Sequence, residues 1–196
     1  MQKTAKTQDA NPIGEASKKS YRKKYYGPYY NPVMPQPAAK QEFVGDACTL
    51  GRGAAAVLLQ IAFKGVGLGV AVHDRFTVQP VEHARGSIIY IFAMAFGTEA
   101  ERRIVTDATH HEHSRAEVPV TVNDVDLRLW VAATIYWSLL TGYEEVLGKL
   151  DSQTANQVYK EFSIMATGLR VPLPPADRLA FREYWDKTVS ELWDDR

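Results

Sequence analysis

The five histidines of this chain lie in its central third, at His73, His83, His110, His111 and His113. His110 and His113 are three positions apart, so on a helix they point the same way, about one turn apart. Neutral imidazole is a good ligand for iron, zinc or copper, and a single axial histidine commonly anchors haem. The same side chains are also typical of an exposed helix end, where the macrodipole favours them. The spacing alone leaves both interpretations open.

Two carboxylates lie close to these histidines in the sequence. Asp107 and Glu112 are candidates to accept a hydrogen bond from the second ring nitrogen of a ligating imidazole. A further hypothesis makes one of them a direct ligand, beside His110 and His113, in a metal site without haem. The sequence contains no GxGxxG, P-loop, GxSxG or HExxH motif. The single cysteine, Cys48, excludes an internal disulfide and a thiolate zinc cage, and we expect it to be a small buried side chain.

An arginine and three glycines are further candidates for a site. Arg85 lies on an otherwise apolar helix, where a guanidinium needs a partner such as a carboxylate or a propionate, and Asp74 is one candidate. Glycines at spacing two, Gly65, Gly67 and Gly69, weaken a helix by about 1 kcal/mol each. Such glycines permit close approach of another backbone or of a planar ligand, and tight helix packing is the competing explanation.

The elements that must position these residues are predicted to be helical. No alternation of period two runs for more than a few residues, so we predict an all-α fold of about six helices. A capping box at Thr98 and Glu101 begins the histidine-rich helix, and Asn123 with Asp126 begins the next. The predicted helices cover residues 47–72, 81–96, 98–115, 124–147, 152–167 and a last one that begins at Pro174 and Pro175.

The middle of the helix over residues 124–147, LWVAATIYWSLL, is apolar on every side, which predicts the buried centre of the fold. We expect Gly148 to end this helix and Gly168 to end the following one in the left-handed conformation. The inward faces of two other helices are predicted from their spacing: Ile88, Ile89, Ile91, Phe92, Ala95 and Phe96 on one, and Leu179, Tyr184, Trp185, Val189 and Leu192 on the last.

Composition and charge limit the class of protein. The chain has 196 residues, which is enough for one domain. Its formal net charge is zero, so it has no overall positive electrostatic field that would attract nucleic acid. Residues 1–40 hold eight basic and two acidic side chains with five tyrosines. We predict a flexible basic tail rich in Tyr and Pro over residues 1–41 and a helical domain over 42–196. Without a signal pattern or an apolar span, we expect an intracellular protein, cytoplasmic or held at a membrane surface by the tail.

Four elements in order resemble a known family. They are AAAVLLQIAFKGVGLGVAVHDRF, QPVEHARGSIIYIFAMAFGTEAER, the histidine-rich helix, and NDVDLRLWVAATIYWSLLTGYE. This run, over about Gly51 to Trp193, resembles the catalytic domain of rubber oxygenases (latex-clearing proteins), a family that includes the ER-bound fungal oxygenase MpaB. The chain departs from it at Phe63-Lys64, where relatives carry His-Pro, and it is shorter than the relatives.

The resemblance implies a globin-like helical core that holds haem b through one histidine between the FGT turn and the tryptophan helix. His113 fits the family pattern best, with His110 second and His111 third. The family places an arginine and a threonine beside the cofactor on the preceding helix. The matching positions here are His83 and Ser87, with Arg85 as the nearest arginine.

The function implied by this resemblance is a haem-dependent oxygenase that cleaves a carbon–carbon double bond of an apolar, isoprenoid or terpenoid substrate with dioxygen. The pocket wall would come from Gly65, Gly67, Gly69, Trp130, Trp137 and Ile89. ER attachment is implied only by analogy. The alternative hypothesis is a shortened helical protein of the same family that binds a partner or lipid without cofactor or catalysis.

Overall fold

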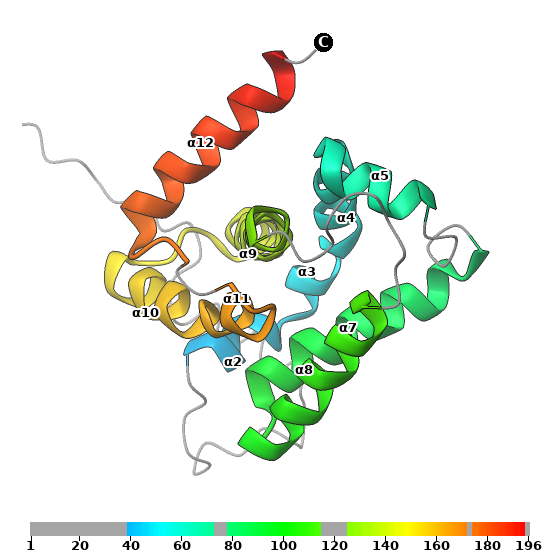
Figure 1. Ribbon diagram of the computed structural model, residues 1–196. Coiled ribbons are helices and arrows are strands. Elements are labelled where there is room, and N and C mark those ends of the chain that lie inside the picture. Colours follow the sequence, from blue (N-terminus) through cyan, green and yellow to red (C-terminus); the bar gives the residue numbers. More distant parts are fainter. Residues whose placement is uncertain (1–38, 73–77, 115–124, 172–173, 195–196) are drawn as a thin grey trace, which may run out of the picture.

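The computed structural model describes residues 39–72, 78–114, 125–171 and 174–194. Every regular element in these ranges is a helix, which confirms the all-α prediction. The tail predicted over residues 1–41 lies, up to residue 38, outside the described residues. The helices (Figure 1) are α2 Ala39–Val44, α3 Ala47–Leu50, α4 Gly53–Ala62, α5 Lys64–Val72, α7 Pro80–Phe96, α8 Glu99–Ser114, α9 Val125–Leu147, α10 Ser152–Phe162, α11 Ile164–Gly168 and α12 Arg178–Asp194.

Helix α9 is the centre of the fold, as its apolar sequence predicts. Figure 1 looks almost along its axis, with the other helices arranged around it. It packs on α3, α4 and α11, and its buried side chains include Trp130, Tyr136 and Leu139. Gly148 follows it with φ 86°, the left-handed conformation that glycine adopts without strain and that ends the helix as predicted. This arrangement agrees with the globin-like core that was predicted.

Helix α12 is held against α9 by aromatic rings. The indole of Trp185 stacks on Trp130 at 5.3 Å and on Trp137 at 4.6 Å between centroids. Phe181 meets Tyr136 edge to face at 4.9 Å. Such pairs add about 0.5–1.5 kcal/mol beyond the area that they bury. Large rings therefore fill the space between two helices whose backbones lie well apart.

The predicted start of α12 is wrong. The helix begins at Arg178, not at the two prolines, because the Asp177 carboxylate caps it by accepting from the Ala180 amide at 2.9 Å. Of the predicted inward residues, Leu179 is 69% exposed, and Phe181 is buried in its place. The predicted positions Tyr184, Trp185, Val189 and Leu192 are buried or half-buried.

The single helix predicted over residues 47–72 is also wrong, because this stretch forms α3, α4 and α5. Between α4 and α5 the chain bends by 100°. A Cβ at Gly67 would lie 2.5 Å from the Ile61 carbonyl oxygen, and one at Gly65 would lie 2.7 Å from Leu127 of α9. These two glycines therefore allow the bend and the close contact with α9, whereas a Cβ at Gly69 would meet nothing within 4 Å. Tight packing explains two of the three glycines.

Helices α7 and α8 form a hairpin that packs on α2 and α11 through α7. Gly97 ends α7, and the predicted capping box of α8 is confirmed. The Thr98 amide donates to Glu101 Oε2 at 2.7 Å, and the Glu101 amide donates to Thr98 Oγ1 at 3.3 Å. The matching prediction at Asn123 lies outside the described residues.

The predicted inward face of α7 is only partly correct. Ile91 and Ala95 are buried, but Ile88, Ile89 and Phe96 are 47%, 48% and 44% exposed. Tyr90 and Met94 are buried in their place. The face turned to the core is rotated because α7 packs on α2 and α11, and not on a continuous layer that would cover its whole apolar surface.

The helix predicted over residues 152–167 is divided at Ser163 into α10 and α11. Gly168 does not take the left-handed conformation, which Arg170 adopts instead with φ 60°. The reason for a glycine at this position is space, since a Cβ would lie 2.5 Å from both Met94 Cε and Tyr90 Oη of α7. The predicted glycine cap is therefore wrong.

No single helix among the described residues is long and apolar enough to cross a bilayer, although the bent pair Ala47–Ala62 and Lys64–Ala71 passes the same test when taken together. That result concerns length and composition only.

Candidate functional site

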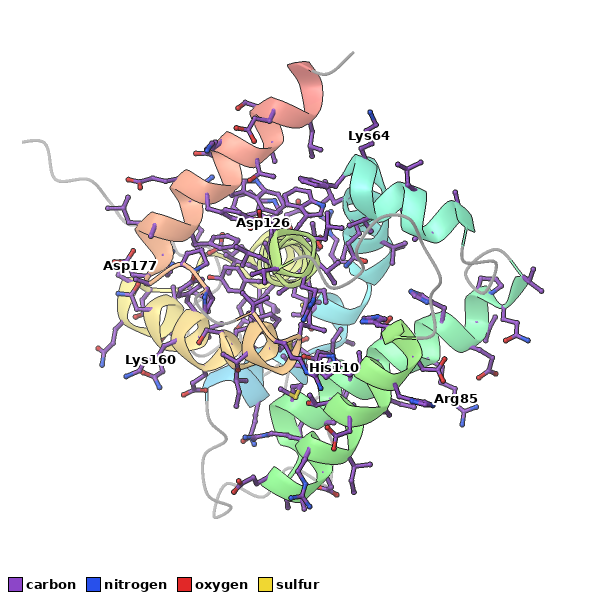
Figure 2. The ribbon with its side chains drawn as sticks, viewed as in Figure 1. Lys64, Arg85, His110, Asp126, Lys160 and Asp177 are labelled. Carbon is purple, nitrogen blue, oxygen red and sulfur yellow. The ribbon has the colours of Figure 1, made fainter. Side chains whose placement is uncertain are left out.

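The three histidines of α8 have different surroundings. His110 is half-buried, and its Nε2 lies 3.2 Å from the Gly168 carbonyl oxygen of α11. His111 and His113 are exposed. Figure 2 shows His110 beside α11, on the inner side of the hairpin. The three histidines therefore do not share one environment, and which of them would act as a ligand stays a prediction.

His110 is held in its neutral form near neutral pH. Partial burial lowers its pKa, and the positive charges of Arg170 and Arg128 lower it further. The hydrogen bond with the Gly168 carbonyl and the charge of Asp107 oppose this effect without reversing it. Since Nε2 donates to a backbone carbonyl, this imidazole serves as a contact between helices.

The direction of His113 follows from helix geometry. At 100° per residue, His113 lies within about 20° of Arg102 and Thr106 around the axis of α8. Those two residues belong to the half-buried stripe of this helix. His111 lies on the opposite side, about 180° from Arg102. His113 therefore lies on the same side of α8 as this stripe, although its own side chain is exposed.

Arg85, His83 and Ser87 lie on the neighbouring helix α7. The Arg85 side chain is 70% exposed and 3.6 Å from Glu82, and Figure 2 shows it on the outer side of the hairpin. Ser87 Oγ donates to the His83 carbonyl at 3.1 Å, and His83 is exposed. Asp74, a predicted partner of Arg85, lies outside the described residues.

The hairpin places these residues at the same end as the α8 histidines. Arg85 lies 11 positions before the end of α7, and His110 lies 11 positions after the start of α8. Each distance is about 16 Å along its helix. In an antiparallel pair joined by a two-residue turn, the two positions lie at the same level. Arg85 and His110 therefore lie at about the same height along the hairpin, but their side chains point to different sides.

Trp130 and Gly69 differ in how much room surrounds them. Trp130 is fully buried, its Nε1 donates to the Leu59 carbonyl at 3.0 Å, and its ring contacts Phe63 and Trp185. Gly69 has open space on its Cβ side. Only the surroundings of Gly69 leave room for a further group.

Neither of two hollows among the described residues is lined by a histidine. One is a crevice of about 30 Å³ between α9, α10, α11 and α12. The other is an open groove of about 370 Å³ near the α7–α8 turn, lined by Phe92, Ala93, Phe96, Gly97, Glu101 and Val105. The crevice is far smaller than the 300 Å³ or more that is typical of a cofactor site.

Metal and thiol chemistry receive no support from the described residues. No group of three or more His, Cys, Asp or Glu side chains within them is arranged to hold a metal ion, so the hypothesis that combined His110 and His113 with Asp107 or Glu112 has no geometric basis there. Burial and the neighbouring Asp46 raise the pKa of the Cys48 thiol to about 12, and its Sγ donates to Asp46 at 3.5 Å. A thiol so seldom ionised is a poor nucleophile.

Comparison with known proteins identifies the family. Residues 41–196 match the model of the ER-bound oxygenase mpaB/B'/rubber oxygenase catalytic domain, and the chain belongs to this family. The uncharacterized proteins Rv2237 of Mycobacterium tuberculosis and Mb2261 of Mycobacterium bovis are each 36% identical to it over 151 residues, which cover 71% of this chain. The chain spans 59% of the length of these relatives. No solved structure matches.

A cofactor attached through one imidazole would need a single histidine of α8. Haem iron takes a single axial histidine, whereas a metal bound by protein alone needs several ligands. His113 lies on the side of α8 that carries the half-buried stripe, but its own side chain is exposed and lines neither of the two hollows. His110 fits less well, because its Nε2 already contacts Gly168.

The sequence alone did not identify the residues that surround His110. Arg128 of α9 and Arg170 after α11 come close to it only in the folded chain. The sequence does draw attention to Gly168, because a glycine after an apolar run is typical of a helix end. That pattern predicted a left-handed cap, which is wrong.

Proposed function

We propose that this protein is a haem b-dependent oxygenase that acts on an apolar substrate of the isoprenoid or terpenoid class. The observation that carries the proposal is the place of His113, on the side of α8 that carries the half-buried stripe, in a chain that belongs to an oxygenase family. We assign the catalytic domain to residues 42–196. When bound, haem b supplies dioxygen activation, and in this family that chemistry leads to cleavage of a carbon–carbon double bond.

The chain's own residues have the following roles in this proposal. His113 would hold the iron through one of its ring nitrogens. Arg85, now 3.6 Å from Glu82, would pair with a cofactor propionate, since a guanidinium pairs well with carboxylates. Ser87 and His83 offer hydrogen-bonding groups at the same level of the hairpin. Gly69, which has open space on its Cβ side, and Trp130 are the further residues that we assign to the pocket.

The apolar character of the substrate is supported by side chains near this end of the hairpin. Ile88 and Ile89 of α7 are nearly half exposed, and Val81 is 74% exposed. Apolar side chains that lie next to one another on a surface commonly mark a place where an apolar ligand or partner binds.

A second candidate function is a cofactor-free helical protein of the same family that binds a partner or lipid. The observation that favours it is the dense aromatic interior, in which the ring of Trp130 is already packed by Phe63 and Trp185. In this case the exposed residues of α7 would form the binding surface.

Haemin reconstitution separates the two functions. The full chain is titrated with haemin and its Soret absorbance is followed, with His113→Ala as the test variant. His111→Ala is the matched control, because it removes an exposed imidazole from the opposite side of the same helix.

We expect the wild type and His111→Ala to give the same Soret band and His113→Ala to lose it. A folded wild type that takes up no haemin contradicts the oxygenase and supports the cofactor-free protein. Equal binding by all three proteins contradicts the assignment of His113.

A further inference from the structure

One hydroxyl in the interior of the fold lacks a hydrogen-bond partner. Tyr136 of α9 is 3% exposed, and its Oη forms no hydrogen bond with any described residue. An unpaired buried donor is costly, and in native proteins a water, an ion or a ligand is the usual explanation for one. The Tyr136 side chain lines the crevice between α9, α10, α11 and α12. The occupant of that crevice is therefore the partner to look for.

The crevice is small and its wall is largely apolar. The wall includes Leu129, Ala132, Ala133 and Met165. Its volume of about 30 Å³ leaves room for about two groups of the size of a water molecule, each of which needs about 10–15 Å³. An occupant must therefore be a very small molecule or a short alkyl group with one polar end.

The other hydroxyls in the wall already donate their hydrogens. Tyr159 Oη donates to the Pro175 carbonyl at 2.7 Å. Ser163 Oγ donates to the carbonyl of the residue three positions before it, also at 2.7 Å. Among the described residues of the wall, Tyr136 is thus the side chain with a hydrogen to donate, and the occupant must bring an acceptor.

A positive charge lies close to this hydroxyl. Arg178 is half-buried and lies one turn before Phe181 on the same side of α12, and the Phe181 ring meets the Tyr136 ring at 4.9 Å. Arg178 Nη1 donates to Asn156 Oδ1 of α10 at 3.3 Å, and no carboxylate among the described residues forms an ion pair with it. Figure 2 shows this end of α12, labelled at Asp177, beside α10.

The electrostatics of Tyr136 agree with this arrangement. Burial raises the pKa of its hydroxyl to about 12, while the positive charge of Arg178 acts in the opposite direction. The hydroxyl therefore keeps its hydrogen at neutral pH, and the guanidinium is near it without donating to it. A neutral donor and a cation that are close but not bonded to each other can both bind one negatively charged oxygen.

We propose that this crevice binds a small monocarboxylate of about the size of acetate. The carboxylate accepts from Tyr136 Oη and pairs with the Arg178 guanidinium, and the alkyl end lies against the apolar wall. No histidine lines the crevice. The site is therefore separate from the α8 histidines, and it does not depend on the proposed oxygenase activity.

Thermal melts of the full chain at neutral pH test the site, with sodium acetate replacing sodium chloride at constant ionic strength. Acetamide, which has the shape of acetate without its charge, is the neutral comparison. Tyr136→Phe removes the donor. Arg178→Met removes the cation at a half-buried position and is the second loss variant if the first does not fold. Tyr90→Phe is the matched control, because it removes another buried hydroxyl, one that donates to a backbone carbonyl.

We expect acetate, and not acetamide, to raise the Tm of the wild type, because a ligand that binds only the folded chain stabilises it. The shift should correspond to a Kd on the order of 1 mM, as expected for so small a ligand. Tyr136→Phe and Arg178→Met should weaken acetate binding by about 10- to 100-fold, the effect of losing a hydrogen bond to a charged group.

The two tyrosine variants should also differ without acetate. Tyr136→Phe should melt at or above the wild-type temperature, because it removes an unpaired buried hydroxyl. Tyr90→Phe should melt at a lower temperature, because it leaves a carbonyl without its donor, and it should keep the full acetate shift.

Three results overturn the proposal. If acetate and chloride give the wild type the same Tm, the crevice binds no carboxylate and holds water only. If acetamide gives the same shift as acetate, the site does not recognise the negative charge. If Tyr136→Phe or Arg178→Met keeps the full acetate shift, acetate binds somewhere else.

Discussion

The interior around α9 and α12 and the hairpin of α7 and α8 are built differently. Between α9 and α12, stacked rings such as Trp130, Trp185 and Trp137 are packed on several sides. In the hairpin, α8 buries none of its described side chains fully. It packs on α7, its half-buried Val105 contacts the core, and its capping box and His110 add hydrogen bonds. The large buried rings thus lie in one region, while the candidate chemistry lies in the other, where α8 is only partly buried.

The largest expected effect comes from the aromatic region. Trp185→Ala should lower the free energy of unfolding by about 3–5 kcal/mol, because it leaves a cavity between Trp130 and Trp137. Urea denaturation measures this change. Leu179→Ala on the same helix is the control, since an exposed side chain should change stability by at most about 0.5 kcal/mol. If the two substitutions lowered the free energy of unfolding equally, the aromatic rings would not be the main source of stability in this region.

The next effect tests the contact between the two regions. Gly168→Ala should cost about 1–3 kcal/mol, because the new methyl group overlaps Met94 and Tyr90 and must displace them. Gly69→Ala is the matched control at an open helical position and should stabilise by about 0.5–1 kcal/mol. Opposite signs in thermal melts support the packing described here, and a stabilising Gly168→Ala would refute it.

A smaller effect is expected at the start of α8. Thr98→Ala removes the cap and should cost about 1 kcal/mol, measured by thermal melts. Glu101→Gln keeps the second half of the capping box, since glutamine also accepts from the Thr98 amide. It should therefore be milder than Thr98→Ala. If both changes were silent, local capping would contribute nothing to the hairpin.

The smallest effect is a pH dependence at His110. Its folded pKa lies below its ordinary value of 6.5, so below about that pH the unfolded chain binds the proton more readily. The free energy of unfolding should therefore fall as the pH is lowered from 7.5 to 5.5, and fall less in His110→Gln. Urea midpoints at the two pH values test this, and identical slopes in both proteins would exclude His110 as the source.

The sequence determined those features that local chemistry decides. The apolar run LWVAATIYWSLL makes α9 central because no face of it tolerates water, and Thr98 with Glu101 start α8 because cap and carboxylate are three residues apart. The relative directions of His110, His111 and His113 also follow from helical spacing, and so does the order of motifs that identifies the family.

Only the tertiary structure decided which way each helix is turned. Spacing gives the angle between two side chains of one helix but not the rotation of that helix, which depends on distant contacts such as those of His110 and Tyr90 with α11. For the same reason Gly168 proved to be a packing position, Phe181 replaced Leu179 in the core, and the stretch after Ala47 formed three helices.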